Sequence, residues 1–167
     1  DFVFFLGDNF YPHGVESIQS PRFKEFEKTY AAINRPILAV LGNHDVKGDA
    51  LAQVAYSTQS RIWRMPNFRY SFQAGPVYFI AANTNCRPDY LFHIHRQLAK
   101  ASLPWPLVAG HHTLYSSGWH GDADIFNRAY WRWFLEDRVS FYLNGHDHFL
   151  EHLRVPGRRT DYVISGT

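Results

Sequence analysis

Short apolar runs alternate along the chain with segments whose apolar residues recur at helical spacing. Residues 1–6 form an apolar run that stops at Gly7, which is typical of a buried strand that ends at a loop. Ser20 and Pro21 open a segment that keeps helical spacing as far as Ile33, which predicts a helix. Strands that alternate with helices in this way predict an α/β fold. The expected strands are residues 1–6, 37–41, 68–74, 77–82, 107–109, 139–143, 149–154 and 162–164, and the expected helices are residues 20–33, 49–57, 89–101 and 124–136.

Four of these strands are followed directly by polar clusters that open with glycine. Glycine lets the backbone turn sharply and approach a ligand closely. Ligands of α/β sheets bind beyond the carboxyl ends of the strands, so four such ends can converge on one site. The clusters are residues 7–11 (GDNFY), 42–45 (GNHD), 110–112 (GHH) together with 118–121 (GWHG), and 145–148 (GHDH).

Composition narrows the class of protein. A chain of 167 residues with 46% apolar and 19% charged residues predicts one globular domain, residues 1–167, with a core of its own. No apolar run is long enough to cross a bilayer, so we expect no membrane partner. Lysine and arginine are scattered and the net charge is +2, which argues against a nucleic-acid partner. Ten histidines on such a chain are a reason to look for metal ligands.

The side chains in the four clusters carry carboxylate, amide, imidazole and phenol groups. This set suits zinc, iron or manganese, and does not suit a site built on soft thiolates. One carboxylate among several neutral imidazoles also suits two cations held close together. An aspartate can bridge such a pair, and the pair can hold the attacking and leaving oxygens of a phosphoryl displacement.

Each cluster also has an ordinary structural interpretation. Asp8 suits a turn after a strand, and Asn43 to Asp45 suit a loop with local side-chain to backbone bonds. His111 and His112 suit a pair on the surface. Taken singly, each of these interpretations is at least as good as a functional one. The occurrence of all four clusters in order, each after a strand, favours a common site.

In this order, the four clusters resemble the motifs of the calcineurin-like metallophosphoesterases. Tyr11, three residues after Asp8, resembles the purple acid phosphatase branch, as do residues 7–15 (GDNFYPHGV) and 110–121 (GHHTLYSSGWHG). The resemblance extends from Gly7 to Gly166. It implies a four-layer α/β/β/α sandwich, in which two sheets face each other and the helices lie outside.

The resemblance also implies roles for individual side chains. His44 and His120 would stand over the phosphate, where they stabilise its charge or protonate the leaving alkoxide. Asp45 would orient the imidazole of His44. Two metal ions are implied, iron(III) in the first site and iron(II), zinc or manganese in the second. The implied metal ligands are Asp8 as the bridge, Tyr11 and His148 on the first ion, and Asn43, His111 and His146 on the second.

The activity that the resemblance implies is hydrolysis of phosphate monoesters, with a metal-bound hydroxide as the nucleophile and an acidic pH optimum. The substrate would be a small phosphate ester or a phosphoprotein, and a secreted, periplasmic or lysosomal protein is implied. Two alternatives stay open. One is a phosphodiesterase or nucleotide pyrophosphatase on the same scaffold, and the other is a non-catalytic member that binds proteins.

One expected motif is missing from the sequence. Members of the family carry an Asp-x-Gly at the end of an earlier strand, and its aspartate completes the shell of the first metal. Asp1 cannot replace it, because it lies seven residues before Asp8 on one strand, roughly 23 Å away at about 3.3 Å per residue. We therefore expect the chain to lack the first strand of the fold and its C-terminal edge.

The remaining candidates favour structural roles. His93 and His95 lie two apart in an expected helix, so they face different sides of it. Cys86 is expected to be a small buried hydrophobic residue. Residues 130–134, with four aromatic side chains, are expected to form part of the core or of a helix that covers the sheet.

Overall fold

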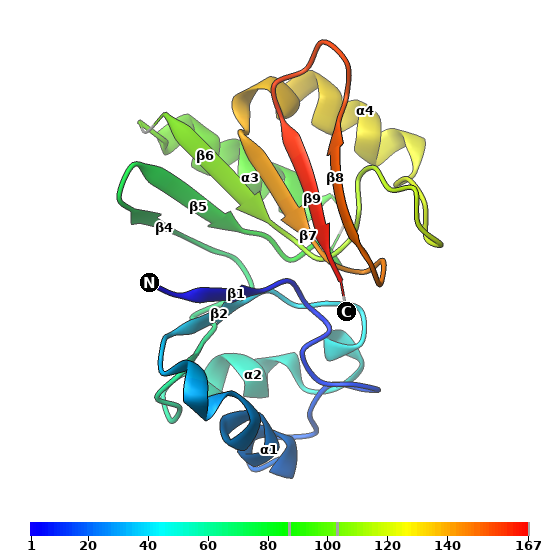
Figure 1. Ribbon diagram of the computed structural model, residues 1–167. Coiled ribbons are helices and arrows are strands. Elements are labelled where there is room, and N and C mark those ends of the chain that lie inside the picture. The colour runs from blue at the N-terminus through cyan, green and yellow to red at the C-terminus, as the bar shows by residue number, and fades with distance from the viewer. Residues whose placement is uncertain (87, 103, 167) are drawn as a thin grey trace.

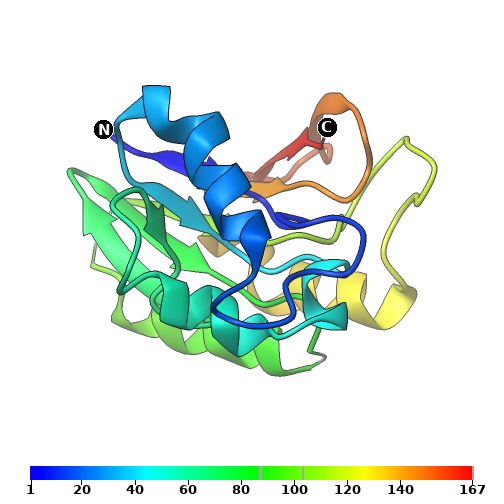
Figure 2. The same cartoon turned by 90° about the horizontal axis from the view of Figure 1, so that it is seen from below.

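Two β-sheets face each other in the computed structural model, which describes residues 1–86, 88–102 and 104–166. Helices α1 (Pro21–Tyr30) and α2 (Ala50–Tyr56) lie on the outer side of the smaller sheet. Helices α3 (Asp89–Lys100) and α4 (Ile125–Phe134) lie on the outer side of the larger one (Figures 1 and 2). The predicted four-layer α/β/β/α arrangement is therefore confirmed.

The smaller sheet has three parallel strands in the order β1-β2-β3. Its third strand was not expected from the sequence, because it is only two residues long and ends in an arginine. Parallel pairing brings the carboxyl ends of β1 and β2 to one edge, where two of the polar clusters begin. The strands are β1 (Val3–Phe5), β2 (Ile37–Ala39) and β3 (Trp63–Arg64).

The larger sheet has the strand order β4-β5-β6-β7-β9-β8, with four parallel strands in the middle and antiparallel pairs at both edges. Strand β6 begins two residues before the expected Leu107 and includes Pro106, which has no N–H to donate. Pro106 joins the sheet through its carbonyl alone, which accepts a hydrogen bond from the Ser140 N–H at 2.8 Å. The strands are β4 (Tyr70–Ala74), β5 (Val77–Ala81), β6 (Trp105–Ala109), β7 (Phe141–Asn144), β8 (Leu150–Arg154) and β9 (Asp161–Ser165).

The ends of the helices follow from local chemistry. The Asp49 carboxylate accepts from the Ala52 N–H and begins α2, and the Asp124 carboxylate accepts from two N–H groups and begins α4. Helix α1 continues as a 3₁₀ turn, Ala31–Ile33, so that the predicted end at residue 33 is confirmed. Asn34 then leaves the helical region with a φ of 45°. The other 3₁₀ turns are Asp45–Lys47 and Glu136–Arg138.

Apolar side chains fill the three spaces between the four layers. Val40, Ala81 and Ala109 are buried between the sheets, and Phe4 and Leu6 pack against them. The small residues let the ends of the two sheets approach closely where the polar clusters lie. Under α1 and α2 the core includes Phe10, Phe23, Phe26 and Trp63, and under α3 and α4 it includes Ile80, Ile94, Trp131 and Tyr142.

One expectation about a side chain is wrong. Cys86 is exposed and not buried, because it lies in the loop that precedes α3. The expectation that residues 130–134 form part of a helix that covers the sheet is confirmed, since they lie in α4 (Figure 1). Within α4, Trp131 is fully buried, but Trp133 is 76% exposed and Phe134 is 46% exposed. Four aromatic side chains within five helical residues cannot all face one core, because successive residues point about 100° apart. Within the described ranges, no helix has the length and apolar content needed to span a bilayer.

Candidate metal centre

The loops after β1, β2, β6 and β7 meet at one place between the two sheets. Asp8 and Tyr11 follow β1, and Asn43 follows β2. The loops of the larger sheet are tied together by a hydrogen bond from the Gly145 N–H to the His111 carbonyl at 3.1 Å. The structure thus brings all six predicted metal ligands together, and they are Asp8, Tyr11, Asn43, His111, His146 and His148.

Glycine is required where these loops approach each other. A Cβ atom at Gly7, whose φ is 91°, would lie 2.5 Å from Nδ1 of His111. A Cβ atom at Gly42 would overlap the Asp8 carboxylate. The bare backbone therefore gives the polar side chains the space in which they converge.

Two of the predicted ligands have an unusual backbone conformation. Asp8 has a φ of 55° and His146 has a φ of 70°, and both lie in the left-handed region. A residue with a side chain occupies that region at a cost on the order of 1 kcal/mol. Such strain is concentrated at functional sites, where it aims a side chain at a ligand.

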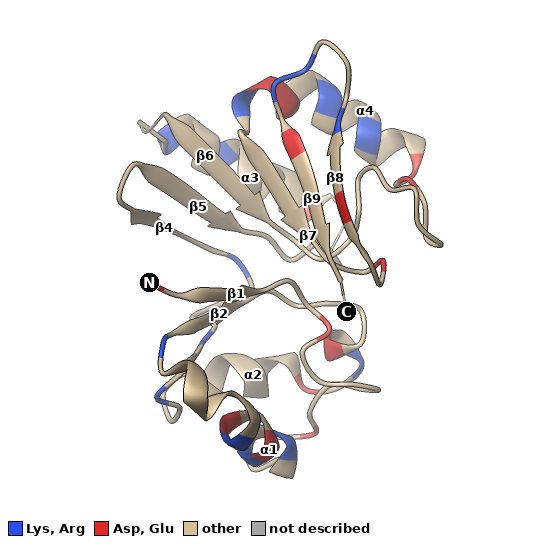
Figure 3. Cartoon of the chain, viewed as in Figure 1, with Lys and Arg blue, Asp and Glu red and all other residues tan. Residues whose placement is uncertain are grey.

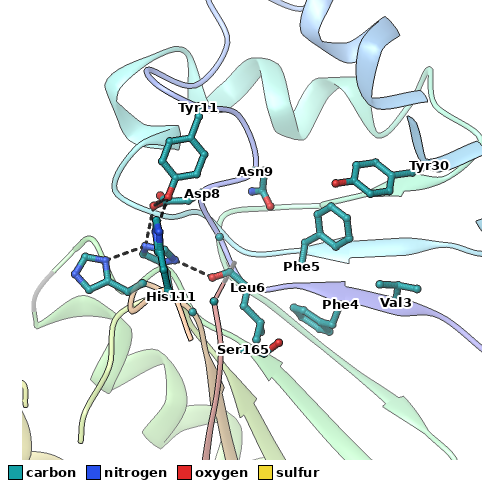
Figure 4. Close-up of a pocket in the computed structure, with 15 residues that line it drawn as sticks. Val3, Phe4, Phe5, Leu6, Asp8, Asn9, Tyr11, Tyr30, His111 and Ser165 are labelled. Carbon is teal, nitrogen blue, oxygen red and sulfur yellow. Dashed lines mark hydrogen bonds and ion pairs between the residues drawn. The ribbon is translucent and has the colours of Figure 1, made fainter. Parts of the chain in front are cut away.

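One half of the cluster is built on Asp8. Its Oδ2 atom accepts a hydrogen bond from the Tyr11 hydroxyl at 3.0 Å, and that hydroxyl lies 3.1 Å from Nε2 of His148. Its Oδ1 atom accepts from the backbone N–H of His44 at 2.8 Å. Figure 4 shows the phenol of Tyr11 pointing at this carboxylate.

The other half of the cluster is built on His111, which is almost fully buried. Its Nε2 atom lies 3.0 Å from Oδ1 of Asn43 and 3.2 Å from Nδ1 of His146. The same Nε2 atom is 3.4 Å from Oδ2 of Asp8. Asp8 therefore touches both halves.

The tautomer of His111 shows why a cation suits this place. Its Nδ1 atom lies 2.8 Å from the Leu6 carbonyl, which can only accept, so Nδ1 carries the proton (Figure 4). In the neutral ring Nε2 then has a lone pair, and it faces the oxygens of Asn43 and Asp8. Several electron-rich atoms pointing at one another are stabilised by a positive ion among them.

The donor set therefore fits a metal. In the part of the chain that the structure describes, no three His, Cys, Asp or Glu side chains alone form a group that could hold an ion. A metal would thus also use the phenol of Tyr11 and the amide of Asn43. This mixed oxygen and nitrogen set matches zinc, iron and manganese.

The electrostatics of the cluster agree with this donor chemistry. Burial raises the pKa of Asp8, but the His111 ring in its protonated form, the His44 N–H and the Tyr11 hydroxyl outweigh it and hold this pKa well below its usual range. Burial, with the neighbouring Asp8, raises the pKa of Tyr11 to about 12. Burial and the adjacent imidazoles lower the pKa of His146 to about 4. Carboxylate and neutral imidazole are the protonation states in which these groups bind metals.

His44 and His120 lie on opposite sides of the cluster. The His44 ring packs on Tyr11 at 4.4 Å between centroids, and its Nδ1 atom is 2.6 Å from the Pro12 carbonyl. The exposed His120 ring stacks on His146 at 3.9 Å. Each imidazole thus contacts a different predicted ligand at the solvent side.

Asp45 does not have the predicted role of orienting His44. Its carboxylate is fully buried and accepts hydrogen bonds from the backbone N–H groups of Asn9, Phe10 and Gly42 at 2.8–3.2 Å. The 3₁₀ turn that begins at Asp45 directs the side chain inward, away from the imidazole of its neighbour. Asp45 therefore holds the loops after β1 and β2 together.

Two further side chains support the site and were not singled out from the sequence. Asp147 is buried and its Oδ1 atom accepts from the His120 N–H at 2.9 Å. Thr84 accepts at its hydroxyl oxygen from the N–H groups of His111 and His112, at 3.3 and 3.1 Å. Asp147 lies inside the fourth cluster and so could have been found there. Thr84 follows β5, where no motif marks it.

A cavity of about 420 Å³ opens beside the cluster and runs along β1. Five of the six predicted ligands line it, all except Asn43. Its other wall is apolar, with Val3 to Leu6 and Tyr30 (Figure 4). His44 and His120 do not line this cavity.

The sequence matches the model of the Calcineurin-like phosphoesterase family over residues 1–150. The chain belongs to this family. It is 30% identical over 195 residues to purple acid phosphatase 3 of Arabidopsis thaliana, and 32% identical over 197 residues to human tartrate-resistant acid phosphatase type 5. Both alignments cover 99% of the chain, but the chain spans only 53% and 60% of these relatives. This calcineurin-like phosphoesterase thus resembles the purple acid phosphatases along its whole sequence.

Solved structures share its fold. GAP50, described as the anchor in the inner membrane complex of Plasmodium, superposes with a TM-score of 0.82 at 24% identity and covers 99% of this chain and 61% of its own. The purple acid phosphatase PPD1 from yellow lupin seeds has a TM-score of 0.72 at 20% identity, and the alignment covers 98% of this chain and 36% of the lupin chain. At these identities the likeness concerns the fold alone.

Proposed function

We propose that this chain carries most of a dinuclear metal centre that hydrolyses phosphate monoesters. The observation that supports this most directly is the position of Asp8, whose carboxylate touches Tyr11 on one side and His111 on the other. A carboxylate between two donor groups is where a ligand shared by two ions belongs. The six side chains that would hold the metals are Asp8 as the bridge, Tyr11 and His148 on the first ion, and Asn43, His111 and His146 on the second.

When bound, the metals would supply Lewis acidity, which would neutralise phosphate charge and lower the pKa of water in the site. Iron(III) with iron(II), zinc or manganese is the pair that we propose, and the mixed oxygen and nitrogen donor set supports it. The protein's own contribution is to fix the ligands. The Leu6 carbonyl sets the tautomer of His111, and the left-handed backbone aims Asp8 and His146.

His44 and His120 are proposed to act on the substrate itself. With Nδ1 of His44 donating to the Pro12 carbonyl, the Nε2 atom of the protonated ring would donate a hydrogen bond to a phosphate oxygen or a proton to the leaving group. The backbone of His120 is fixed by Asp147, and its exposed ring can reach a substrate above His146. A proton delivered from either imidazole to the departing alkoxide completes the cleavage.

The test compares metal content with turnover in the same preparation. The chain is purified without chelator, its metals are counted by elemental analysis, and p-nitrophenyl phosphate is compared with bis(p-nitrophenyl) phosphate. We expect bound iron and faster cleavage of the monoester. Faster cleavage of the diester would favour the phosphodiesterase alternative. A folded chain that binds no metal would overturn the proposal and favour a protein-binding role, the second alternative.

A further inference from the structure

Helix α4 carries large apolar side chains on its outer face. Phe126 is 83% exposed, Trp133 is 76% exposed and Ile125 is 69% exposed. Exposed apolar residues are normally scattered singly, whereas these gather on one side of the helix, where Phe126 and Trp133 lie seven residues, or about two turns, apart. The opposite face of α4 is the one that packs into the core, through Asn127 and Trp131.

The stripe continues onto the neighbouring helix. Phe92 of α3 is 51% exposed, and its ring lies 5.8 Å from that of Tyr130. Tyr130 in turn lies 4.8 Å from Phe134, which is 6.4 Å from His95 of α3. The apolar surface thus bridges two helices. We refer to it as the aromatic ridge, and its members are Phe92, Ile125, Phe126, Tyr130, Trp133 and Phe134.

Cations flank the ridge. Helix α4 contains Arg128 and Arg132 and no acidic residue within its bounds, while Asp124 caps its start and Glu136 and Asp137 follow its end (Figure 3). Arg128 forms an ion pair with Asp122 at 2.6 Å, while Arg132 has no ion pair or hydrogen bond among the described residues. Both line a hollow of about 240 Å³ beside Trp133. Within the described part of the chain, Arg132 therefore offers a cation without an ion-pair partner beside Trp133, on the half of α4 that lies away from Asp124.

We propose that the aromatic ridge is a contact with the surface of an anionic phospholipid bilayer. A helix of ten residues is about 15 Å long and can lie in the plane of the interface, with its aromatic side chains among the headgroups. Arginine side chains beside it reach the lipid phosphates. A protein partner would need a surface complementary to these side chains, whereas a fluid bilayer adapts to them.

Co-sedimentation with vesicles tests the proposal. The purified chain is mixed with vesicles of phosphatidylcholine and phosphatidylserine, and with vesicles of phosphatidylcholine alone. We expect binding to the anionic vesicles that falls by roughly tenfold or more in the double variant Phe126→Ser, Trp133→Ser. Arg132→Gln should weaken it by roughly fivefold, the effect of one cation near an anionic surface. Unchanged sedimentation of the double variant would overturn the proposal.

Quenching by brominated phosphatidylcholine locates the contact. We expect part of the tryptophan fluorescence to be quenched, and this part to disappear in Trp133→Ser. Trp105→Ser is the matched control, because Trp105 is also exposed, at 53%, but lies at the start of β6 beside a different hollow. Loss of quenching in the control and not in Trp133→Ser would contradict the proposal. So would a dimer in sedimentation velocity that the double variant abolishes, since the ridge would then bind a second copy.

Discussion

The Asp8 carboxylate lies 3.4 Å from Nε2 of His111, although the two residues belong to different sheets. Asp8 follows the first strand of the smaller sheet, and His111 follows a central strand of the larger one. Their contact is the point at which the two halves of the candidate centre meet. The predictions below test whether this contact is a metal bridge.

Asp8→Asn is expected to reduce metal content and phosphatase activity together. The neutral amide cannot balance the charge of a cation. Metal affinity should therefore fall by more than the roughly 10–100-fold that is lost when a residue that only hydrogen-bonds to a metal ligand is mutated. Elemental analysis and monoester turnover measure the two effects. Asp89→Asn makes the same chemical change in an exposed ion pair with Arg69 and should alter neither. Full metal content in Asp8→Asn would remove Asp8 from the set of ligands.

His120→Ala is expected to keep the metals and to lower kcat by about 10²–10⁴-fold, the range of general acid catalysis. Its ring stacks on His146 and, among the described residues, takes no part in the hydrogen bonds of the cluster. Metal analysis with steady-state kinetics separates the two outcomes. His152→Ala, a histidine that pairs with Asp161 on β9, is the control. If His120→Ala loses metal, the division between ligands and substrate-binding residues is wrong.

Asp45→Asn is expected to destabilise the fold more than it affects the chemistry. The buried carboxylate accepts from several N–H groups, and an amide nitrogen in place of one oxygen leaves buried donors facing each other. The free energy of unfolding should fall by about 2–4 kcal/mol, measured by urea denaturation. If stability is unchanged and kcat falls, Asp45 orients His44 after all.

Asp161→Asn is expected to lower stability at neutral pH and to have little effect in acid. The Arg154 guanidinium first, and then His152, hold the pKa of Asp161 below its usual range. The Arg154–Asp161 pair therefore stabilises the folded protein at pH values above the pKa of Asp161 in the unfolded chain, about 3.9. This stabilisation is lost as the pH falls through the lower pKa that Asp161 has in the folded protein. Melting temperatures of both proteins between neutral pH and about pH 3 give the difference. A difference that grows in acid would contradict this assignment.

Sequence patterns were sufficient to find the loops of the site but not the contacts behind them. Glycine followed by polar residues after a strand marks Asp8, Asn43, His111 and His146, because the strand ends of such folds are where ligands bind. The sequence neighbours of Asp45 suggested a bond to His44. Its actual partners, Asn9 and Phe10, lie 36 and 35 residues away and become adjacent only when β1 and β2 pair.

The helical period could have been used to predict which aromatic side chains of α4 are buried and which are exposed. Helical spacing allows Asn127 and Trp131 to face the core together, and it then turns Trp133 outward. The short strand β3 could not have been predicted in this way. Two residues carry no periodicity, and the strand exists because Trp63 pairs beside Ile37 and is buried under α1.

The donors of the candidate centre come from loops of both sheets, with Asp8, Tyr11 and Asn43 on the smaller one and His111, His146 and His148 on the larger one. A metal ion held by donors from both sides would cross-link the two sheets. Such an ion would oppose their separation and so stabilise the folded protein to an extent set by its binding affinity. Removal of the metal would then loosen the whole sandwich and not the candidate centre alone.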